Sequence, residues 1–458
     1  MWRRAVAWVD ERLNVMPLWH GFLDRKVPKG IGWFHVFGSA TLFLLVLQFA
    51  TGIFLTVYYA PSTEHAYESI KFINEQVPFG KYVAGIHLWS ASILVVVIGV
   101  HMLRTFAYGA YKYPRETTWI TGVVLLFLVL AFAFTGYLLP YDQKAYWATV
   151  VGTNIAGAGP FVGDWALRVL RGGTAVGALT LQRFYAFHIW LLPAALALFV
   201  AAHLFMVIRQ GIAAPPRRRP LDLGADAAGL PRREVYERQY AMEKQAGHPF
   251  YVSILKDAVF ALLLFLAVSA LALTLGTPLE PPANPNATTY VPRPEWYFLD
   301  FFQLLWYLQG QWEPLGIFLI VLGVVLVLLL LPFYDRSPER HPVRRPIAMA
   351  SAVIAIVAVM GLTYLGARSP GSAPAPAAAG GAAVPPGARE FQTQGCAGCH
   401  TIAGVGGTAG PNLSHIGGLL TRAQLQTTIL NGATGMPAFS HISPEALNAL
   451  LNYLESLK

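Results

Sequence analysis

Four histidines stand inside long apolar stretches of the sequence, where an ionisable side chain is costly and usually serves a function. His87 and His101 are 14 residues apart in one stretch, and His188 and His203 are 15 residues apart in another. On a helix, 14 residues rise by roughly 21 Å, close to four turns, so both imidazoles of a pair point the same way. A hydrogen-bonded packing histidine would explain any one of them alone. Four at matched spacing predict two non-covalent, bis-histidine b-type haems stacked across a membrane.

Glycines in two neighbouring apolar stretches repeat the spacing of the histidines. Gly38 and Gly52 are 14 residues apart, and so are Gly122 and Gly136. Glycine lets a flat macrocycle approach the backbone closely. Close packing of membrane helices is the alternative role, so the glycines indicate haem contacts only because they are in register with the histidines.

A second group of residues that could bind a cofactor lies near the C-terminus. The only two cysteines, Cys396 and Cys399, form one CxxCH motif with His400. Such a motif attaches haem covalently through both thiols and supplies the proximal iron ligand from its histidine. Zinc is the alternative, but no second thiol pair or nearby histidine pair at zinc spacing is present. The motif therefore predicts one covalent haem c.

The second iron ligand of this haem is expected to be Met436, the only methionine after residue 360. The proline that follows it and the amphipathic run 443–457 resemble those of small class I cytochromes c. His415 and His441 are the alternative ligands. A methionine ligand raises the haem potential, which suits an electron acceptor.

The rest of the sequence is apolar enough to place these groups in a membrane. Its 458 residues are 55% hydrophobic and only 12% charged, which excludes an ordinary soluble globule. The net charge of +9 is divided among short clusters and forms no basic face for nucleic acid. We expect an all-α fold of seven transmembrane helices, surrounded by lipid, and a small α-helical domain. The expected spans are 33–59, 82–108, 117–139, 182–208, 251–275, 314–333 and 346–366.

The distribution of basic residues sets the orientation. They gather before the first span and after the second, fourth and sixth, so these loops and the N-terminus are expected in the cytoplasm. The amphipathic segment 1–16 lacks a cleavage site and is expected to lie along the inner membrane surface. Spans two and four then both run inwards, which assigns His87 and His188 to an outer haem and His101 and His203 to an inner one.

The chain is expected to divide into four parts. Residues 1–210 form a dihaem four-helix region, 211–366 a three-helix region, 367–388 a linker rich in Pro, Ala and Gly, and 389–458 the cytochrome c domain. An odd number of spans places everything after residue 366 outside the cell membrane, where c-type haem attachment takes place.

Residues 17–366 resemble the cytochrome b of quinol-oxidising bc-type complexes. The similar motifs are GYLLPYDQ (136–143), TLQRFYAFHIWLLP (180–193), HPFY (248–251) and PEWY (294–297). The 15-residue histidine step is similar to the chloroplast and Gram-positive branch, whose last three spans are usually a separate chain but are fused here. The resemblance implies a dimer.

The resemblance also implies that PEWY lines an outer quinol-oxidation site. Quinol oxidation releases protons with electrons, so the site needs a carboxylate that takes up a proton and turns towards water, as Glu295 could. Trp296 and Tyr297, next to Pro294, would form a wall for the quinone ring. An interfacial aromatic belt with one exposed glutamate is the alternative.

The implied enzyme is a quinol:cytochrome c oxidoreductase. One electron would leave to a separate Rieske iron–sulfur protein, then pass through the fused haem c to a soluble cytochrome c or a terminal oxidase. The other would cross to an inner quinone site and contribute to a proton gradient. A dihaem anchor for a dehydrogenase, and an electron-inert haem scaffold or transporter, are the competing functions.

The chain departs from the family at several positions. Val36 stands where the chloroplast-like branch has a cysteine that tethers a third haem, so no covalent third haem is expected. Ala84 replaces an arginine expected near the outer haem, whose propionate partner would then be Lys81 or Arg183. Arg104 keeps its place near the inner haem. Lys256 and Asp257 are similar to an inner quinone-site pair, with a snorkelling lysine and a solvated aspartate as the alternative.

Overall fold

The computed structural model describes residues 2–157, 159, 161–173, 176–217, 229–285, 290, 293–307, 313–368, 385–403, 405–406, 410–433, 436, 438–440 and 442–458. Within this part of the chain, six helical units are long and apolar enough to cross a membrane. They are α3 (Phe37–Tyr58), α5 (Gly80–Ala107), α6 (Glu116–Tyr137), the continuous Ala178–Gln210, α12 (Phe250–Thr274) and α15 (Pro346–Arg368). A further helix, α14 (Glu313–Tyr334), contains the shorter apolar stretch Leu322–Tyr334. The expected membrane-spanning, mostly helical fold is confirmed.

Short elements connect these helices. They are α1 (Trp2–Leu13), α2 (Val15–Leu23), α4 (Ala66–Glu75), α7 (Gln143–Gly157), α8 (Gly163–Arg171), α11 (Arg232–Gln245) and α13 (Leu299–Trp306). Single 3-10 turns cover Trp33–His35, Trp296–Phe298 and Pro342–Arg344. One antiparallel strand pair, β1 (Lys26–Val27) with β2 (His248–Pro249), joins the segment before α3 to the start of α12.

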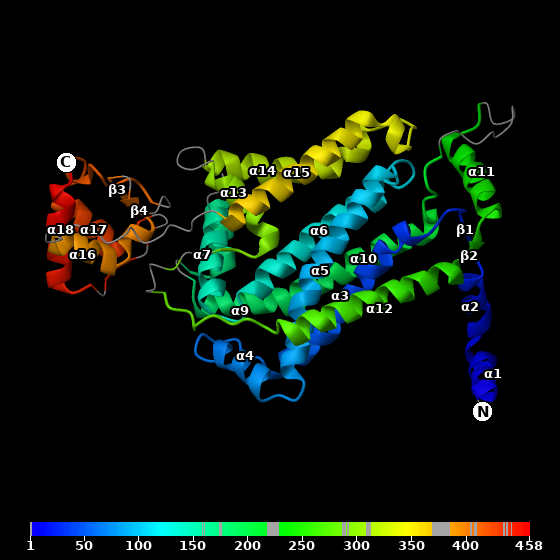
Figure 1. Ribbon diagram of the computed structural model, residues 1–458, viewed down its shortest axis with the longest axis horizontal. Coiled ribbons are helices and arrows are strands. Elements are labelled where there is room, and N and C mark those ends of the chain that lie inside the picture. Colours follow the sequence, from blue (N-terminus) through cyan, green and yellow to red (C-terminus); the bar gives the residue numbers. More distant parts are fainter. Residues whose placement is uncertain are drawn as a thin grey trace.

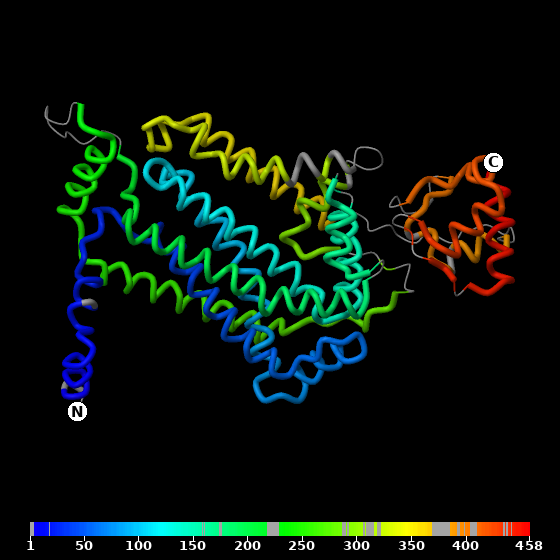
Figure 2. The backbone as a smooth tube through the Cα atoms, turned by 180° about the vertical axis from the view of Figure 1, so that it is seen from behind, coloured from blue at the N-terminus to red at the C-terminus, as the bar shows by residue number. Residues whose placement is uncertain are grey.

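The long helices lie side by side in one bundle, with α14 and α15 along one flank (Figure 1). The view from behind agrees: α4 and α7 are at one end of the bundle, while α1, α2 and α11 are at the other (Figure 2). Apolar side chains of α3, α5, α6, α10 and α12 form the central core. A Cβ on Gly85 of α5 would lie 2.9 Å from the Cβ of Ala272 on α12, so glycine permits this close helix contact.

The unit Ala178–Gln210 is not a uniform α-helix. Between α9 (Ala178–Ala186) and α10 (Leu192–Gln210), the residues Phe187–Leu191 form a π-helical turn that contains His188. A π-turn accommodates one residue more than an α-turn. It therefore explains how the 15-residue step from His188 to His203 can match the 14-residue step from His87 to His101 in depth.

The α5–α6 loop docks against the loop that joins α14 to α15. Lys112 Nζ and Arg345 Nη2 contact the Asp335 carboxylate at 2.8 and 3.0 Å, and the Tyr111 hydroxyl donates to the same group. Tyr111, Lys112 and Arg345 are buried. Burial raises the pKa of Asp335, but the hydrogen bonds and charges of these partners outweigh it and hold the pKa below its usual value. The network fastens α14 and α15 to the four-helix region.

The C-terminal unit contains α16 (Pro386–Thr393), α17 (Arg422–Asn431), α18 (Pro444–Ser456) and the strand pair β3 (Thr401–Ile402) with β4 (Val405–Gly406). Thr421 and Ser443 cap α17 and α18 by accepting backbone N–H bonds. Leucines of α18 pack on Leu425 and Ile429 of α17. Residues 369–384, most of the expected linker, lie outside the described residues.

Candidate functional site

The four intramembrane histidines form two facing pairs. His87 of α5 faces His188 of the π-turn with ring centroids 6.3 Å apart, close to the Phe132 ring. His101 of α5 and His203 of α10 lie near each other further along the bundle. His87 thus lies opposite His188 and His101 opposite His203, as the helix directions predicted.

Threonine hydroxyls fix the tautomer of three of these histidines. The Oγ1 atoms of Thr51, Thr121 and Thr135 lie 2.8, 3.0 and 3.2 Å from Nδ1 of His87, His203 and His188, respectively. Each hydroxyl already donates its proton to a backbone carbonyl one turn earlier in its own helix. Each oxygen must therefore accept the Nδ1 proton, which leaves Nε2 with a free lone pair for a metal.

The four glycines lie against the imidazole rings of the four histidines. A Cβ built on Gly38 would be 3.2 Å from His101, and one on Gly136 only 2.6 Å from His188. Gly52 faces His87 and Gly122 faces His203, both at 3.4 Å, with the nearest ring atom Cε1 in all four cases. Glycine therefore makes room for the imidazole ring at each of these positions, and contact with a haem macrocycle stays a prediction.

The expected propionate partners differ in their surroundings. Arg104 packs over the Tyr108 ring at 5.0 Å, and within the described part of the chain its buried Nε and Nη2 have no hydrogen-bond partner. A buried guanidinium without an acceptor fits an anionic group at this position. Arg183 instead donates to the carbonyls of Arg168 and Val169 at the end of α8. Its role towards a haem remains a prediction.

The CxxCH segment holds a buried histidine with one ring nitrogen already bonded. His400 is buried, and its Nδ1 lies 2.9 Å from the carbonyl of Pro411, which accepts the Nδ1 proton and leaves Nε2 free. Burial raises the pKa of the Cys396 thiol to about 11. Met436 packs against the same apolar core as Cys396, whereas His415 is exposed. His441 lies outside the described residues.

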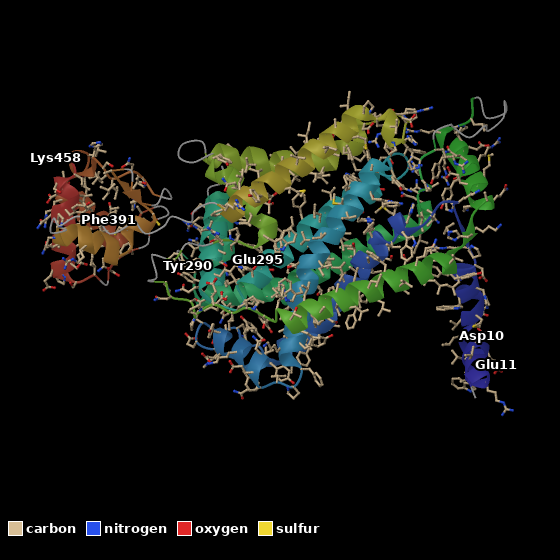
Figure 3. The ribbon with its side chains drawn as sticks, in the orientation of Figure 1. Asp10, Glu11, Tyr290, Glu295, Phe391 and Lys458 are labelled. Carbon is tan, nitrogen blue, oxygen red and sulfur yellow. The ribbon has the colours of Figure 1, made fainter. Side chains whose placement is uncertain are left out.

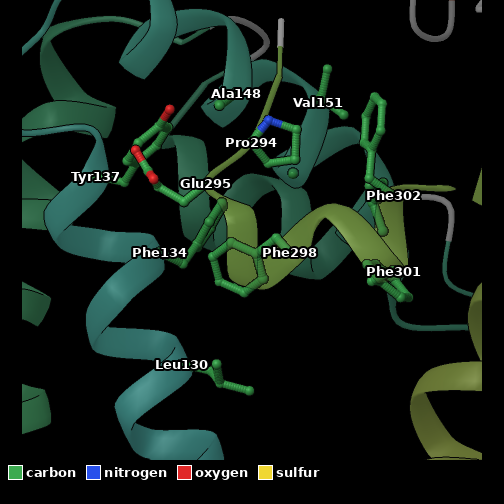
Figure 4. Close-up of a pocket in the computed structure, with 12 residues that line it drawn as sticks. Leu130, Phe134, Tyr137, Ala148, Val151, Pro294, Glu295, Phe298, Phe301 and Phe302 are labelled. Carbon is green, nitrogen blue, oxygen red and sulfur yellow. The ribbon is translucent and has the colours of Figure 1, made fainter. Parts of the chain in front are cut away.

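PEWY borders an apolar pocket of about 230 Å³ between α6, α7 and α13. Its lining residues are Leu130, Phe134, Tyr137, Ala148, Val151, Gly152, Ile155, Pro294, Glu295, Phe298, Phe301 and Phe302. Figure 4 shows the Glu295 carboxyl directed towards Tyr137, whose buried hydroxyl has no partner among the described residues. Figure 3 places Glu295 towards the end of the bundle that lies away from Asp10 and Glu11.

Two of the four PEWY residues line this pocket directly. Trp296 and Tyr297 are outside the lining, although their rings stack edge to face with centroids 5.4 Å apart. Burial and then the charge of Glu295 raise the pKa of Tyr297, so its hydroxyl stays protonated. Lys144, at the start of α7, pairs with Glu295 at 2.7 Å.

A smaller pocket lies at the opposite end of the bundle, beside the start of α12. Lys256 and Asp257 line it together with Ser253, Val36 and His35. Burial and then the charge of Arg104 lower the pKa of His35 to about 3, so its ring is neutral. Lys256 and Asp257, the pair expected at an inner quinone site, thus line the same pocket as Val36. Val36 is the position where the related branch has a tethering cysteine.

Sequence reasoning missed the three threonines and Lys144. The signal for the threonines was present as the dipeptide Thr-Gly, which occurs at 51–52, 121–122 and 135–136, directly at three of the four glycines. Phe37 occupies the corresponding position before Gly38. No local pattern connects Lys144 to Glu295, because 151 residues separate them.

Three family models match the chain. "Cytochrome b/b6/petB" covers residues 22–211, "Cytochrome b(C-terminal)/b6/petD" covers 282–381, and "Cytochrome C oxidase, cbb3-type, subunit III" covers 382–454. The cytochrome b subunit of menaquinol:cytochrome c reductase from Bacillus subtilis is 44% identical over 223 residues, 47% of this chain and 100% of that protein. Cytochrome b6 from Synechococcus is 42% identical over 212 residues, 46% of this chain and 99% of that protein.

A solved structure titled "Hyperthermophilic respiratory Complex III" extends the similarity beyond the first half. It superposes with a TM-score of 0.69 at 29% identity, over 80% of this chain and 92% of that one. The N-terminal half therefore matches whole curated relatives, and the similarity continues through the later helices.

Proposed function

Since this chain belongs to the cytochrome b/b6 family and ends in a cytochrome c domain, we propose that it is the quinol-oxidising subunit of a bc-type complex. Its relatives are subunits of menaquinol:cytochrome c reductase, which makes a quinol:cytochrome c reductase the matching activity. The outer pocket carries the proposal, because it combines a long apolar lining with the Glu295 carboxylate and the Tyr137 hydroxyl.

The residues around the histidine pairs fit two b-type haems. Threonine-fixed tautomers, glycines that admit the imidazoles and the unpartnered guanidinium of Arg104 all suit bis-histidine ligation. Cys396, Cys399, His400 and Met436 would hold one haem c. When bound, the haems supply one-electron carriers between the two membrane sides and towards the outer acceptor.

The chain's own residues would handle the substrate and its protons. The phenylalanines of α13 exclude water from the quinol ring, and Glu295 takes the hydroxyl proton at the wall of the pocket. The inner pocket beside Lys256 and Asp257 would serve as the quinone-reduction site. One electron would reach this inner quinone, and the other a Rieske iron–sulfur partner, then the fused domain and an external cytochrome c or oxidase.

The topology that follows has seven spans, with α14 as the sixth. The N-terminus is cytoplasmic and the cytochrome c domain lies outside the plasma membrane. The parts 1–210, 211–366, 367–388 and 389–458 form one chain of a homodimeric complex.

Glu295→Gln tests the proposal in membranes that contain the iron–sulfur partner. Turnover should fall about 10- to 100-fold, because the amide cannot take up the proton, while the b and c haem spectra stay unchanged. Glu75→Gln, at an exposed glutamate of α4, is the matched control. Normal turnover in Glu295→Gln would remove this residue from the proton path.

The wild-type protein separates this function from its competitors. Added quinol should reduce the b haems, and an outer-site inhibitor should block that reduction. A haem scaffold or transporter predicts no quinol-dependent reduction. A dihaem dehydrogenase anchor needs neither PEWY nor a cytochrome tail, both of which this chain has.

A further inference from the structure

Glu295 forms an ion pair with a cation that lies beside the pocket. Lys144 Nζ lies 2.7 Å from Glu295 Oε1, and the two side chains are 32% and 23% exposed. Lys144 belongs to the first turn of α7, whereas Glu295 directly precedes the turn that leads into α13. The ion pair therefore joins two walls of the outer pocket at its rim.

The groups around this pair are mostly acidic or phenolic. Asp142 lies just before α7 and accepts N–H bonds from Ala145 and Glu280 at 2.8 and 3.0 Å. The Tyr290 hydroxyl donates to the Glu280 carboxylate at 2.7 Å. Burial raises the pKa of Asp142, and the nearby Lys144 charge opposes this shift.

Two further phenols, Tyr137 of α6 and Tyr297 of PEWY, lie near enough to Glu295 for its charge to act on both. Lys144 Nζ also lies 5.5 Å from the centroid of the Tyr137 ring. Lys144 is thus the ion-pair partner of Glu295, and its charge also acts on Asp142. Its loss would leave the Glu295 carboxylate without this ion pair, which favours the charged form.

We propose that Lys144 is a positioning residue that holds Glu295 as a carboxylate at the pocket wall until a quinol proton arrives, and then releases it. The inference rests on the proposed quinol oxidation. The quinol O–H bond breaks, the proton bonds to a Glu295 oxygen, and the electron leaves to the iron–sulfur partner. Neutralisation removes most of the attraction to the ammonium group, so the carboxylic acid can turn towards water.

The cycle closes when Glu295 gives its proton to water at the pocket rim. The regained negative charge restores the ion pair with Lys144. The lysine thus couples the position of the acceptor side chain to its protonation state. A lysine that only fastened α7 to the PEWY segment would have no such dependence on protons.

The test is the pH dependence of turnover in Lys144→Met and Lys144→Arg, with Lys71→Met on exposed α4 as the control. Without the cation, the Glu295 carboxylate loses the attraction that favours its charged form, so we expect it to accept the quinol proton less well in acid. Turnover of Lys144→Met should fall about tenfold at pH 6 and recover towards wild type near pH 8.5. Lys144→Arg should keep the wild-type profile, since its guanidinium also pairs with a carboxylate.

Two further measurements keep the result decisive. Lys144→Met in a Glu295→Gln background should slow turnover no further than Glu295→Gln alone, because the lysine acts through that carboxylate. If Lys144→Met fails to assemble, Lys144→Gln replaces it, with a side chain that hydrogen-bonds but carries no charge. A uniform loss at all pH values, or an additive double variant, would overturn the proposal.

These outcomes are distinct from failure of the proposed function. If quinol does not reduce the b haems of the wild-type protein, quinol oxidation itself is wrong. If the wild type is active but Lys144→Met shares its pH profile, only the positioning role fails.

Discussion

Gly136→Ala should remove the outer b haem while leaving the inner one in place. The new Cβ would lie 2.6 Å from His188 Cε1, which is 0.8 Å closer than ordinary contact at 3.4 Å, and 3.1 Å from Nδ1. The ring cannot retreat without losing its bond to Thr135. Overpacking of this kind costs about 1–3 kcal/mol, which corresponds to roughly 5- to 150-fold weaker haem retention.

Gly52→Ala is the matched control because Gly52 faces His87, the opposite ligand of the same haem. Its Cβ would lie 3.4 Å from the nearest ring atom, an ordinary contact. A pyridine haemochrome assay measures the ratio of b to c haem, with the covalent haem c as internal standard. The ratio should be two to one in the wild type and in Gly52→Ala, and approach one to one in Gly136→Ala. Equal loss in both variants would show that the macrocycle, and not the imidazole, requires these glycines, and would refute the reasoning.

Two further variants test the hydrogen bond to a histidine and the ion pairs of Asp335. Thr51→Val removes the acceptor of the His87 Nδ1 proton. The imidazole then donates less electron density to the iron, and the loss of a hydrogen bond of about 1 kcal/mol should raise the outer haem potential by about 40 mV. An unchanged potential in a redox titration would contradict this. Asp335→Asn leaves Lys112 and Arg345 buried without a counter-charge and should cost about 2 kcal/mol in thermal unfolding at pH 7. The pKa of Asp335 is lower in the folded protein than its unfolded value of 3.8. Its contribution to the free energy of unfolding is therefore complete above pH 3.8 and is lost as the pH falls through the folded pKa. A variant as stable as wild type at pH 7 would exclude this role.

Local patterns predicted the helices because each span is decided by its own composition. An apolar run must form a helix in a bilayer, where the backbone has no other hydrogen-bond partners. The span expected at 82–108 corresponds to the helix Gly80–Ala107, and the span expected at 251–275 corresponds to the helix Phe250–Thr274. The pairing of His87 with His188 followed as well, because helix direction alternates from span to span.

Other features depended on contacts that no local pattern records. The sequence showed one extra residue between His188 and His203, but the π-turn that accommodates it became visible only in the structure. The hydrogen bonds from Arg183 to the carbonyls of Arg168 and Val169 at the end of α8 were also not predictable from a local pattern. Trp296 was expected on the wall of the pocket, whereas the lining on that side consists of Pro294, Glu295, Phe298, Phe301 and Phe302.

The sequence by itself determined which residues could carry the chemistry: intramembrane histidines, CxxCH and the carboxylate of PEWY are informative through their residue types and short-range spacing. The tertiary structure alone decided how those groups are held. Each threonine that orients a histidine belongs to a different helix from that histidine, and Lys144 meets Glu295 across 151 residues of chain. Periodicity carries information over a few helical turns, whereas such pairs exist only once separate helices have packed together.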